Sequence, residues 1–70
     1  MSDREQGNIK NKWIPIEHQF PPFGDGVLIC DDTYIYIGYR NRSNQFFVEG
    51  KVDEEITDPT HWMYLPDMPV

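Results

Sequence analysis

The sequence lacks several features that define common protein classes. A single cysteine, Cys30, excludes an internal disulfide and any metal site built mainly on thiolates. The longest apolar run, Val27 to Cys30, is far too short to cross a bilayer. The segment from Met1 to Asn11 has no apolar stretch of the kind found in signal peptides. We therefore expect a cytoplasmic protein without a membrane partner.

Positive charge is also scarce. Six basic residues stand against twelve acidic ones, which gives a net charge of −6. Proteins that bind nucleic acids neutralise phosphates with clustered Lys and Arg, so direct nucleic-acid binding is not expected here. Two interpretations of the acidity stay open. The surface either mimics a nucleic acid and occupies a basic groove on a partner, or simply keeps the protein soluble.

A chain of 70 residues is near the lower limit for a self-sufficient hydrophobic core. Two tryptophans, four tyrosines and four phenylalanines compensate, because each can bury roughly 150–250 Å². Residues 1–12 are polar and predict a disordered N-terminal arm, and residues 13–70 predict one small β domain. Dimerisation would bury more surface, so a homodimer is one possible state.

Short strands and turns follow one another from residue 13 onwards. The segment 13–16 is interrupted by proline, which lacks a ladder donor, and predicts an edge strand or a strap across the core. Residues 27–30 are apolar on both faces, as in a central strand. Residues 33–40 alternate with a period of two. They should pair with residues 45–50 across the polar loop 41–44.

The strand predicted at residues 33–40 has two different faces. One face carries Ile35, Ile37 and Tyr39, and the other carries Tyr34, Tyr36 and Gly38. We expect the isoleucine face to enter the core. The tyrosine face is then either a second packed layer or an exposed aromatic patch of the kind found at protein interfaces.

The remaining segments complete the predicted fold. Residues 51–58 are acidic and predict a loop or a single helical turn anchored by Val52 and Ile56. Residues 61–65 predict the last strand, and no segment has the periodicity of a stable helix. The fold class is therefore all-β or β-dominated α+β. We expect a small antiparallel meander of three to five strands, open or curled into a partly open barrel, with Trp13 and Trp62 in its core.

Two sequence blocks carry a family resemblance. The opening block reads Trp-Ile-Pro-Ile at 13–16, Phe-Pro at 20–21, glycines at 24 and 26, and Val-Leu-Ile-Cys at 27–30. The closing block reads Thr-His-Trp-Met-Tyr-Leu-Pro at 60–66. Together they resemble the phage and prophage family catalogued as domain of unknown function 551, from Trp13 to Pro69. Tyr64 stands where the family usually has proline, and Pro59 stands where valine commonly precedes the threonine.

The resemblance implies an accessory protein of temperate phages or their remnants, located in the cytoplasm of the bacterial host. Such proteins often modify host physiology or counter host defences. The resemblance implies no particular biochemical activity.

His61 is the most suggestive polar residue. We expect it to donate a hydrogen bond to a backbone carbonyl and lock the final strand, with ligand binding or acid–base chemistry as the alternative. A metal site of His18, His61, Cys30 and Asp31 has no recognised ligand spacing. The pair Asp31-Asp32 is typical of a tight turn. We expect no enzyme, because the sequence has no catalytic triad or motif, and no cofactor.

Three functions remain. The leading hypothesis is a module that binds a host protein with a basic surface, through acidic residues and an aromatic sheet face. The alternative is a binder of a nucleotide-like small molecule, with a pocket near His61 and Trp62 or at a dimer interface. The third is a structural subunit of a larger phage product. Arg40, Arg42 and Lys51 could cluster at one hairpin end, which keeps the small-molecule hypothesis open. The candidate partner- or ligand-binding residues are Tyr34, Tyr36, Arg40, His61 and Trp62.

Overall fold

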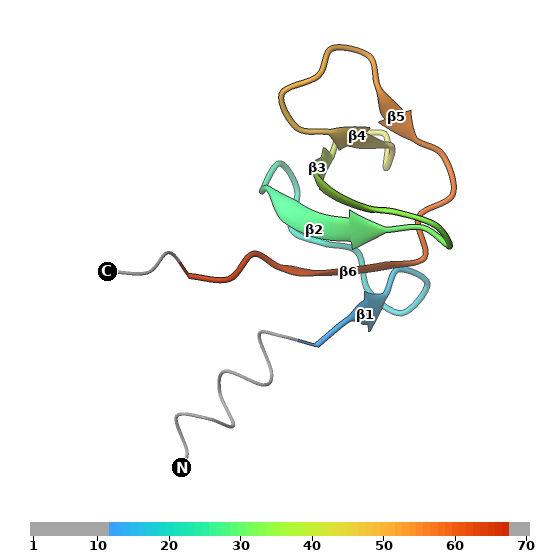
Figure 1. Ribbon diagram of the computed structural model, residues 1–70, viewed down its shortest axis with the longest axis vertical. Helices are drawn as coiled ribbons and strands as arrows, with labels where there is room; N and C mark the ends of the chain where they lie inside the picture. Colours follow the sequence, from blue (N-terminus) through green and yellow to red (C-terminus); the bar gives the residue numbers. More distant parts are fainter. Residues whose placement is uncertain (1–11, 68–70) are drawn as a thin grey trace.

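The computed structural model describes residues 12–67, which form a single antiparallel sheet (Figure 1). Its strands are β1 (Ile14–Pro15), β2 (Val27–Cys30), β3 (Ile35–Arg40), β4 (Phe46–Val48), β5 (Glu55–Ile56) and β6 (His61–Tyr64). Their order in the sheet is β1-β6-β2-β3-β4-β5. The all-β class is confirmed. The sheet has six strands rather than three to five, because two very short strands, β1 and β5, of two residues each, extend it at its two edges.

The described residues contain no helix, and therefore none long and apolar enough to cross a membrane. The predicted arm lies outside the described residues, apart from Lys12.

The last strand lies inside the sheet, next to the edge strand β1. β6 lies between β1 and β2, where Trp62 faces Ile14 on one side and Ile29 on the other. β1 is an edge strand, as predicted. Its Pro15 stands opposite His61 at this edge, where a missing N–H donor is tolerated. The two ends of the domain are therefore held together by side-by-side strands.

The turns follow the predicted side-chain chemistry. Asp31 Oδ1 accepts hydrogen bonds from the backbone N–H groups of Thr33 at 2.8 Å and Tyr34 at 2.7 Å, which closes the β2–β3 turn. In the β3–β4 hairpin, Asn41 Oδ1 accepts from two backbone N–H groups, each at 2.9 Å. Asn44 adopts the left-handed conformation with φ 62°, which asparagine tolerates better than most residues.

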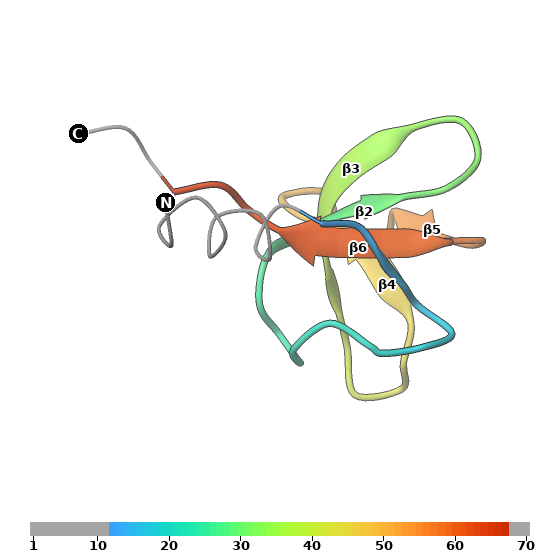
Figure 2. The same cartoon turned by 90° about the horizontal axis from the view of Figure 1, so that it is seen from below.

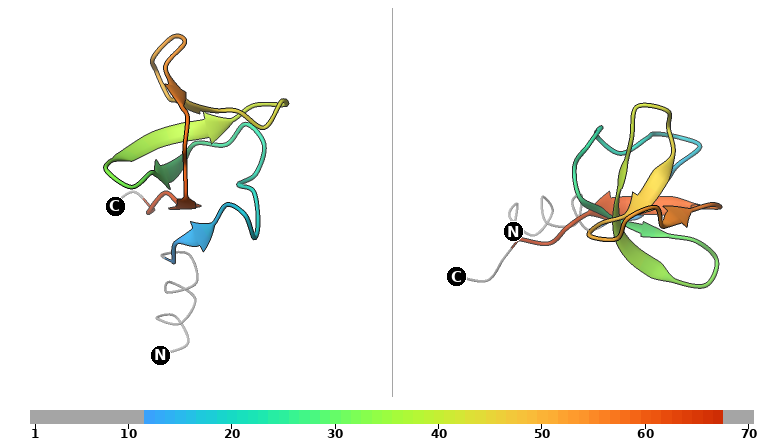
Figure 3. Two further views of the ribbon diagram at one scale, coloured as in Figure 1. Left: turned by 90° about the vertical axis from the view of Figure 1, so that its right-hand side faces the viewer. Right: turned by 90° about the horizontal axis from the view of Figure 1, so that it is seen from above.

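The core lies on one face of the sheet, which we call the inner face. Its buried hydrophobic side chains are Val27, Ile29, Phe46, Ile56 and Trp62. Ile56 on β5 and Trp62 on β6 are four strand positions apart, which in a flat sheet is about 19 Å at the usual spacing. They share one cluster because the sheet is coiled. Figure 2 and the right-hand view of Figure 3 show β4 running across the direction of β6.

The segment between β1 and β2 closes the inner face. Trp62 Nε1 donates a hydrogen bond to the Gln19 carbonyl oxygen at 2.8 Å. Arg40 Nε donates to the Pro21 carbonyl oxygen at 3.0 Å, and Pro21 is itself fully buried. This proline-rich segment acts as a cover that is tied to the sheet at two points.

The predicted orientation of β3 is wrong. Ile35 is 64% exposed and Ile37 is 50% exposed, whereas Gly38 is buried and Tyr36 packs against the core. The reason is steric. A Cβ atom on Gly38 would lie 2.5 Å from the Phe47 carbonyl oxygen, so only the glycine side of β3 can face the closely packed β4. The isoleucines, at odd positions, then point outward.

Three further predictions can be compared with the structure. Trp62 is fully buried, as predicted, but Trp13 is 38% exposed and lies outside the buried core. Val52 is 91% exposed and does not anchor its segment, whereas Ile56 does. Residues 51–58, predicted as a loop or a single helical turn, contain a turn that includes Asp53 at φ 61° and then the short strand β5, which was not predicted.

Candidate functional site

The face of the sheet opposite the core, which we call the outer face, is largely apolar. It is formed by Leu28, Cys30, Ile35, Ile37, Tyr39, Phe47 and Met63, with His61 at one end. Leu28 is flanked in register by Ile37 on β3 and by Met63 on β6. Tyr39 and Phe47 are cross-strand neighbours whose rings stack with centroids 6.1 Å apart. The apolar side chains therefore form one continuous band across four strands.

Carboxylates border this band. Asp32 is exposed in the turn next to Ile35, and Glu55 is exposed opposite Phe47 at the β5 edge. The outer face thus combines an apolar centre with two bordering carboxylates, while Lys51 lines a cleft at its Tyr39 and Phe47 end.

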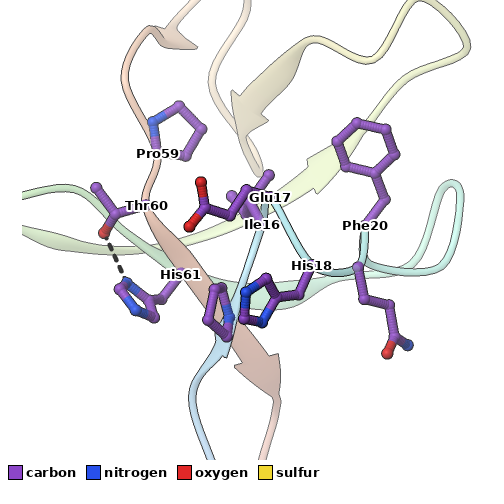
Figure 4. Close-up of a pocket in the computed structure, with 9 residues that line it drawn as sticks. Ile16, Glu17, His18, Phe20, Pro59, Thr60 and His61 are labelled. Carbon is purple, nitrogen blue, oxygen red and sulfur yellow. Dashed lines mark hydrogen bonds between the residues drawn. The ribbon is translucent and has the colours of Figure 1, made fainter.

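A second feature is a cleft of about 650 Å³ between β6 and the segment that follows β1. Both histidines of the chain, His18 and His61, line it together with Glu17 and Thr60. Figure 4 shows His61 at the start of β6 and Thr60 just before it, with Glu17 and His18 on the neighbouring segment. Residues distant in the sequence meet here because β6 pairs with β1.

A hydrogen-bond chain orients His61 in this cleft. Thr60 Oγ1 lies 3.3 Å from the Cys30 carbonyl oxygen and 2.9 Å from His61 Nδ1. A carbonyl only accepts, so both bonds form when the hydroxyl donates to Cys30 O and accepts from His61 Nδ1–H. The partner of His61 is a hydroxyl and not the predicted backbone carbonyl.

This arrangement positions an imidazole but does not activate Thr60, whose proton is directed at a carbonyl. The four residues considered as metal ligands do not form one group: Cys30 pairs with His61 across the sheet, but neither Cys30 nor Asp31 lines the cleft that holds both histidines. Among residues 12–67, no group of three or more His, Cys, Asp and Glu side chains could hold a metal ion.

A third feature lies at the end of the β3–β4 hairpin. Arg40 Cζ is 5.1 Å from the centroid of the Phe20 ring, and Arg42 Cζ is 4.8 Å from that of Phe23. Both arginines line a cleft of about 440 Å³ with Phe23 and Tyr39. Tyr39 also lines an adjoining cleft of about 580 Å³ that contains Lys51. Arg40 and Arg42 therefore share one cleft at the hairpin end, and Lys51, from the turn between β4 and β5, lines the adjoining cleft.

Comparison with known proteins places the chain in a family. The family described as "Protein of unknown function (DUF551)" matches residues 12–70. The chain belongs to this family. The match includes both blocks that carry the resemblance in the sequence, 13–30 and 60–66. No curated protein and no solved structure matches the chain.

In this DUF551 chain the predicted tyrosine pair is not a flat exposed patch. Tyr34 is 63% exposed, but Tyr36 is half-buried, and the two rings meet edge to face with centroids 6.2 Å apart. Tyr36 Oη donates to Asp31 Oδ2 at 3.2 Å. Backbone N–H groups of Tyr34 and Thr33, and then this hydroxyl, lower the pKa of Asp31. Desolvation, followed by the bond to Asp31, raises the pKa of Tyr36.

The other predicted site residues of the DUF551 chain also separate in space. Trp62 is enclosed in the core and does not line the cleft beside His61. Arg40 lies at the hairpin end. The outer-face residues Leu28, Ile37 and Met63 were missed as a surface. The useful signal was the lone glycine at position 38, which marks the face of β3 that has no room for a side chain.

Proposed function

We propose that this protein acts by binding, and that the outer face of its sheet docks a partner protein with a basic surface. The family resemblance supports a setting inside a bacterial host, where the partner would be a host protein and the role that of a phage or prophage accessory factor.

The exposure of the β3 isoleucines carries this proposal. Ile35 is 64% exposed and lies beside Cys30. Ile37 is 50% exposed and lies beside Leu28. A chain this short needs its apolar side chains for the core, yet it keeps these outside. Contiguous apolar surface with an aromatic component is typical of interaction sites. Tyr39 and Phe47 supply that component on the adjoining strand.

Charge supports a basic partner over a second copy of this chain. Each copy has a net charge of −6, and Asp32 and Glu55 border the apolar band. Two copies carry the same net negative charge, and this like charge disfavours their association. A basic partner would gain both apolar burial and attraction to this net charge. Its binding should therefore weaken as the salt concentration rises.

Two variants test the face directly. Ile35→Asp adds a charge to the outer face, and Tyr34→Asp adds the same charge to the neighbouring residue on the other face. The two side chains are equally exposed, at 64% and 63%, so they form a matched pair. Each variant and the wild type are immobilised and exposed to host lysate at about 50 and 300 mM salt, which bracket the range where screening changes most.

We expect one partner that is retained at low salt by the wild type and Tyr34→Asp, released at high salt, and lost by Ile35→Asp. Light scattering of the isolated protein should show a monomer. A partner lost equally by both variants would exclude the outer face. A dimer that Ile35→Asp dissociates would show that a second copy covers the face.

A further inference from the structure

The hairpin end concentrates positive charge in an acidic protein. Residues 12–67 contain four Lys and Arg side chains, and Arg40, Arg42 and Lys51 line the two clefts that meet at Tyr39. Of the three clefts described above, the one with the two arginines has no carboxylate in its lining. Glu17 lines the cleft beside His61, and Asp53 lines the one that contains Lys51.

The Arg40 guanidinium is held in a fixed position from which it can donate a hydrogen bond to an anion. Its Nε donates to Pro21 O at 3.0 Å and its Nη1 to Asn44 Oδ1 at 2.8 Å, and Phe20 lies against its guanidinium. Within the described residues Nη2 has no protein acceptor. A guanidinium fixed in this way binds a phosphate with little further loss of side-chain freedom.

Arg42 offers a planar surface beside this donor. Its guanidinium lies 4.8 Å from the Phe23 ring centroid, and both side chains are exposed. Phe23 covers one side of the guanidinium, so the other side is available. Planar bases stack on arginine guanidinium groups as they do on aromatic rings. The cleft thus places a stacking surface next to an anchored cation.

We propose that this hairpin-end cleft binds a mononucleotide, with its phosphate on Arg40 and its base stacked on Arg42. This site is separate from the proposed docking face, with which it shares only Tyr39. The net charge of −6 favours a ligand with a single phosphate over a nucleic acid strand, whose many phosphates would be repelled. The cleft beside His61 is less suitable for a phosphate than the hairpin-end cleft, because the Glu17 carboxylate lines it and would repel the ligand.

Titration of the ¹⁵N-labelled full chain, followed by NMR, locates the site. The probes are adenosine 5′-monophosphate, guanosine 5′-monophosphate, adenosine, inorganic phosphate and a single-stranded oligonucleotide of eight bases. We expect the monophosphates to shift the backbone amides of Gly24 and residues 40–44 at millimolar or lower concentration. Adenosine and phosphate alone should each bind at least about tenfold more weakly, because each makes one of the two contacts.

Variants then separate stacking from general charge. Arg42→Gln should weaken monophosphate binding about tenfold, and Phe23→Leu should weaken it to a smaller degree. Lys12→Gln removes the same charge away from the cleft and should leave binding within about twofold at constant salt, since distant exposed charges are screened. Unchanged amide dispersion in each spectrum controls for folding.

Four results would overturn the proposal: no shift at the hairpin end, shifts centred on His18 and His61, equal binding of phosphate and monophosphate, or equal losses in Arg42→Gln and Lys12→Gln. Tighter binding of the oligonucleotide would replace the mononucleotide with a strand as ligand. None of these results bears on the docking face, which Ile35→Asp tests separately.

Discussion

Gly38→Ala is the sharpest test of how β3 and β4 pack. An alanine Cβ at this position would lie 2.5 Å from Phe47 O and 3.2 Å from the terminal methyl carbons of both Ile29 and Ile56. The methyl groups can rotate away, but the carbonyl oxygen belongs to a strand that is paired on both sides. β4 would have to move by close to 1 Å to restore an ordinary contact of at least 3.4 Å.

The steric cost should exceed the gain in backbone entropy. Replacing glycine in a strand is favourable by about 0.5–1 kcal/mol when the new methyl group fits. Overpacking a core costs about 1–3 kcal/mol, and a rigid backbone neighbour places this site near the upper end. We expect a net loss of about 2 kcal/mol. For 70 residues the total stability is roughly 4–10 kcal/mol, so Tm should fall by roughly 8–16 °C.

Urea denaturation followed by far-UV circular dichroism measures this loss. Gly24→Ala is the control, because nothing lies within 4 Å of its Cβ position and its φ of +80° makes the cost purely conformational, about 1 kcal/mol. The double variant Gly38→Ala/Ile29→Val should recover less than half of the loss, since Phe47 O remains in place. A Gly38→Ala protein as stable as Gly24→Ala, or full recovery in the double variant, would refute the steric argument.

Two other predictions concern polar contacts. Trp62→Phe removes the indole N–H that donates to Gln19 O, and should cost at least about 1 kcal/mol in the same urea experiment; a smaller loss would show that this bond does not hold the cover segment. Tyr36→Phe should reduce stability at neutral pH and have a smaller effect as the pH falls below about 3.8, because it removes one of the bonds that lower the pKa of Asp31. Asp31 stabilises the fold above its ordinary pKa of 3.8, and this contribution is lost as the pH falls through the lowered value. The raised pKa of Tyr36 stabilises the fold below the ordinary value of 10.0 and is lost as the pH rises through the raised value, so thermal melts of the variant should depend less on pH above about 10. Identical pH profiles for the variant and the wild type would contradict both assignments.

Local chemistry made two turns and all strands except β5 predictable. Asp31 and Asn41 close their turns with bonds to backbone N–H groups a few residues away, so sequence alone identifies them. Pro15 could be assigned to an edge strand for the same kind of reason, the missing donor. The hairpin geometry also predicted that Arg40 and Arg42 would lie together.

Long-range packing decided what the sequence could not predict. Ile35 and Ile37 are the more hydrophobic side of β3, and period-two patterning alone assigns them to the core. The opposite outcome depends on the distance between Gly38 and the β4 backbone, which no local pattern records. Likewise, His18 and His61 share a cleft only because β6 pairs with β1, an event that involves residues far apart in the chain.

The coiling of the sheet explains both why the core is small and why apolar side chains remain exposed on the outer face. Ile56 reaches the space over Gly38 because β4 and β5 turn back across the inner face, where Trp62 and Phe46 fill much of the remaining volume. That arrangement seals the inner face with few side chains and leaves no inward position on β3 for Ile35 or Ile37. Strand propensity alone would be satisfied by threonine at these outward positions, since it is also β-branched. The isoleucines add apolar surface without entering the buried core, and this is the surface on which the proposed docking depends.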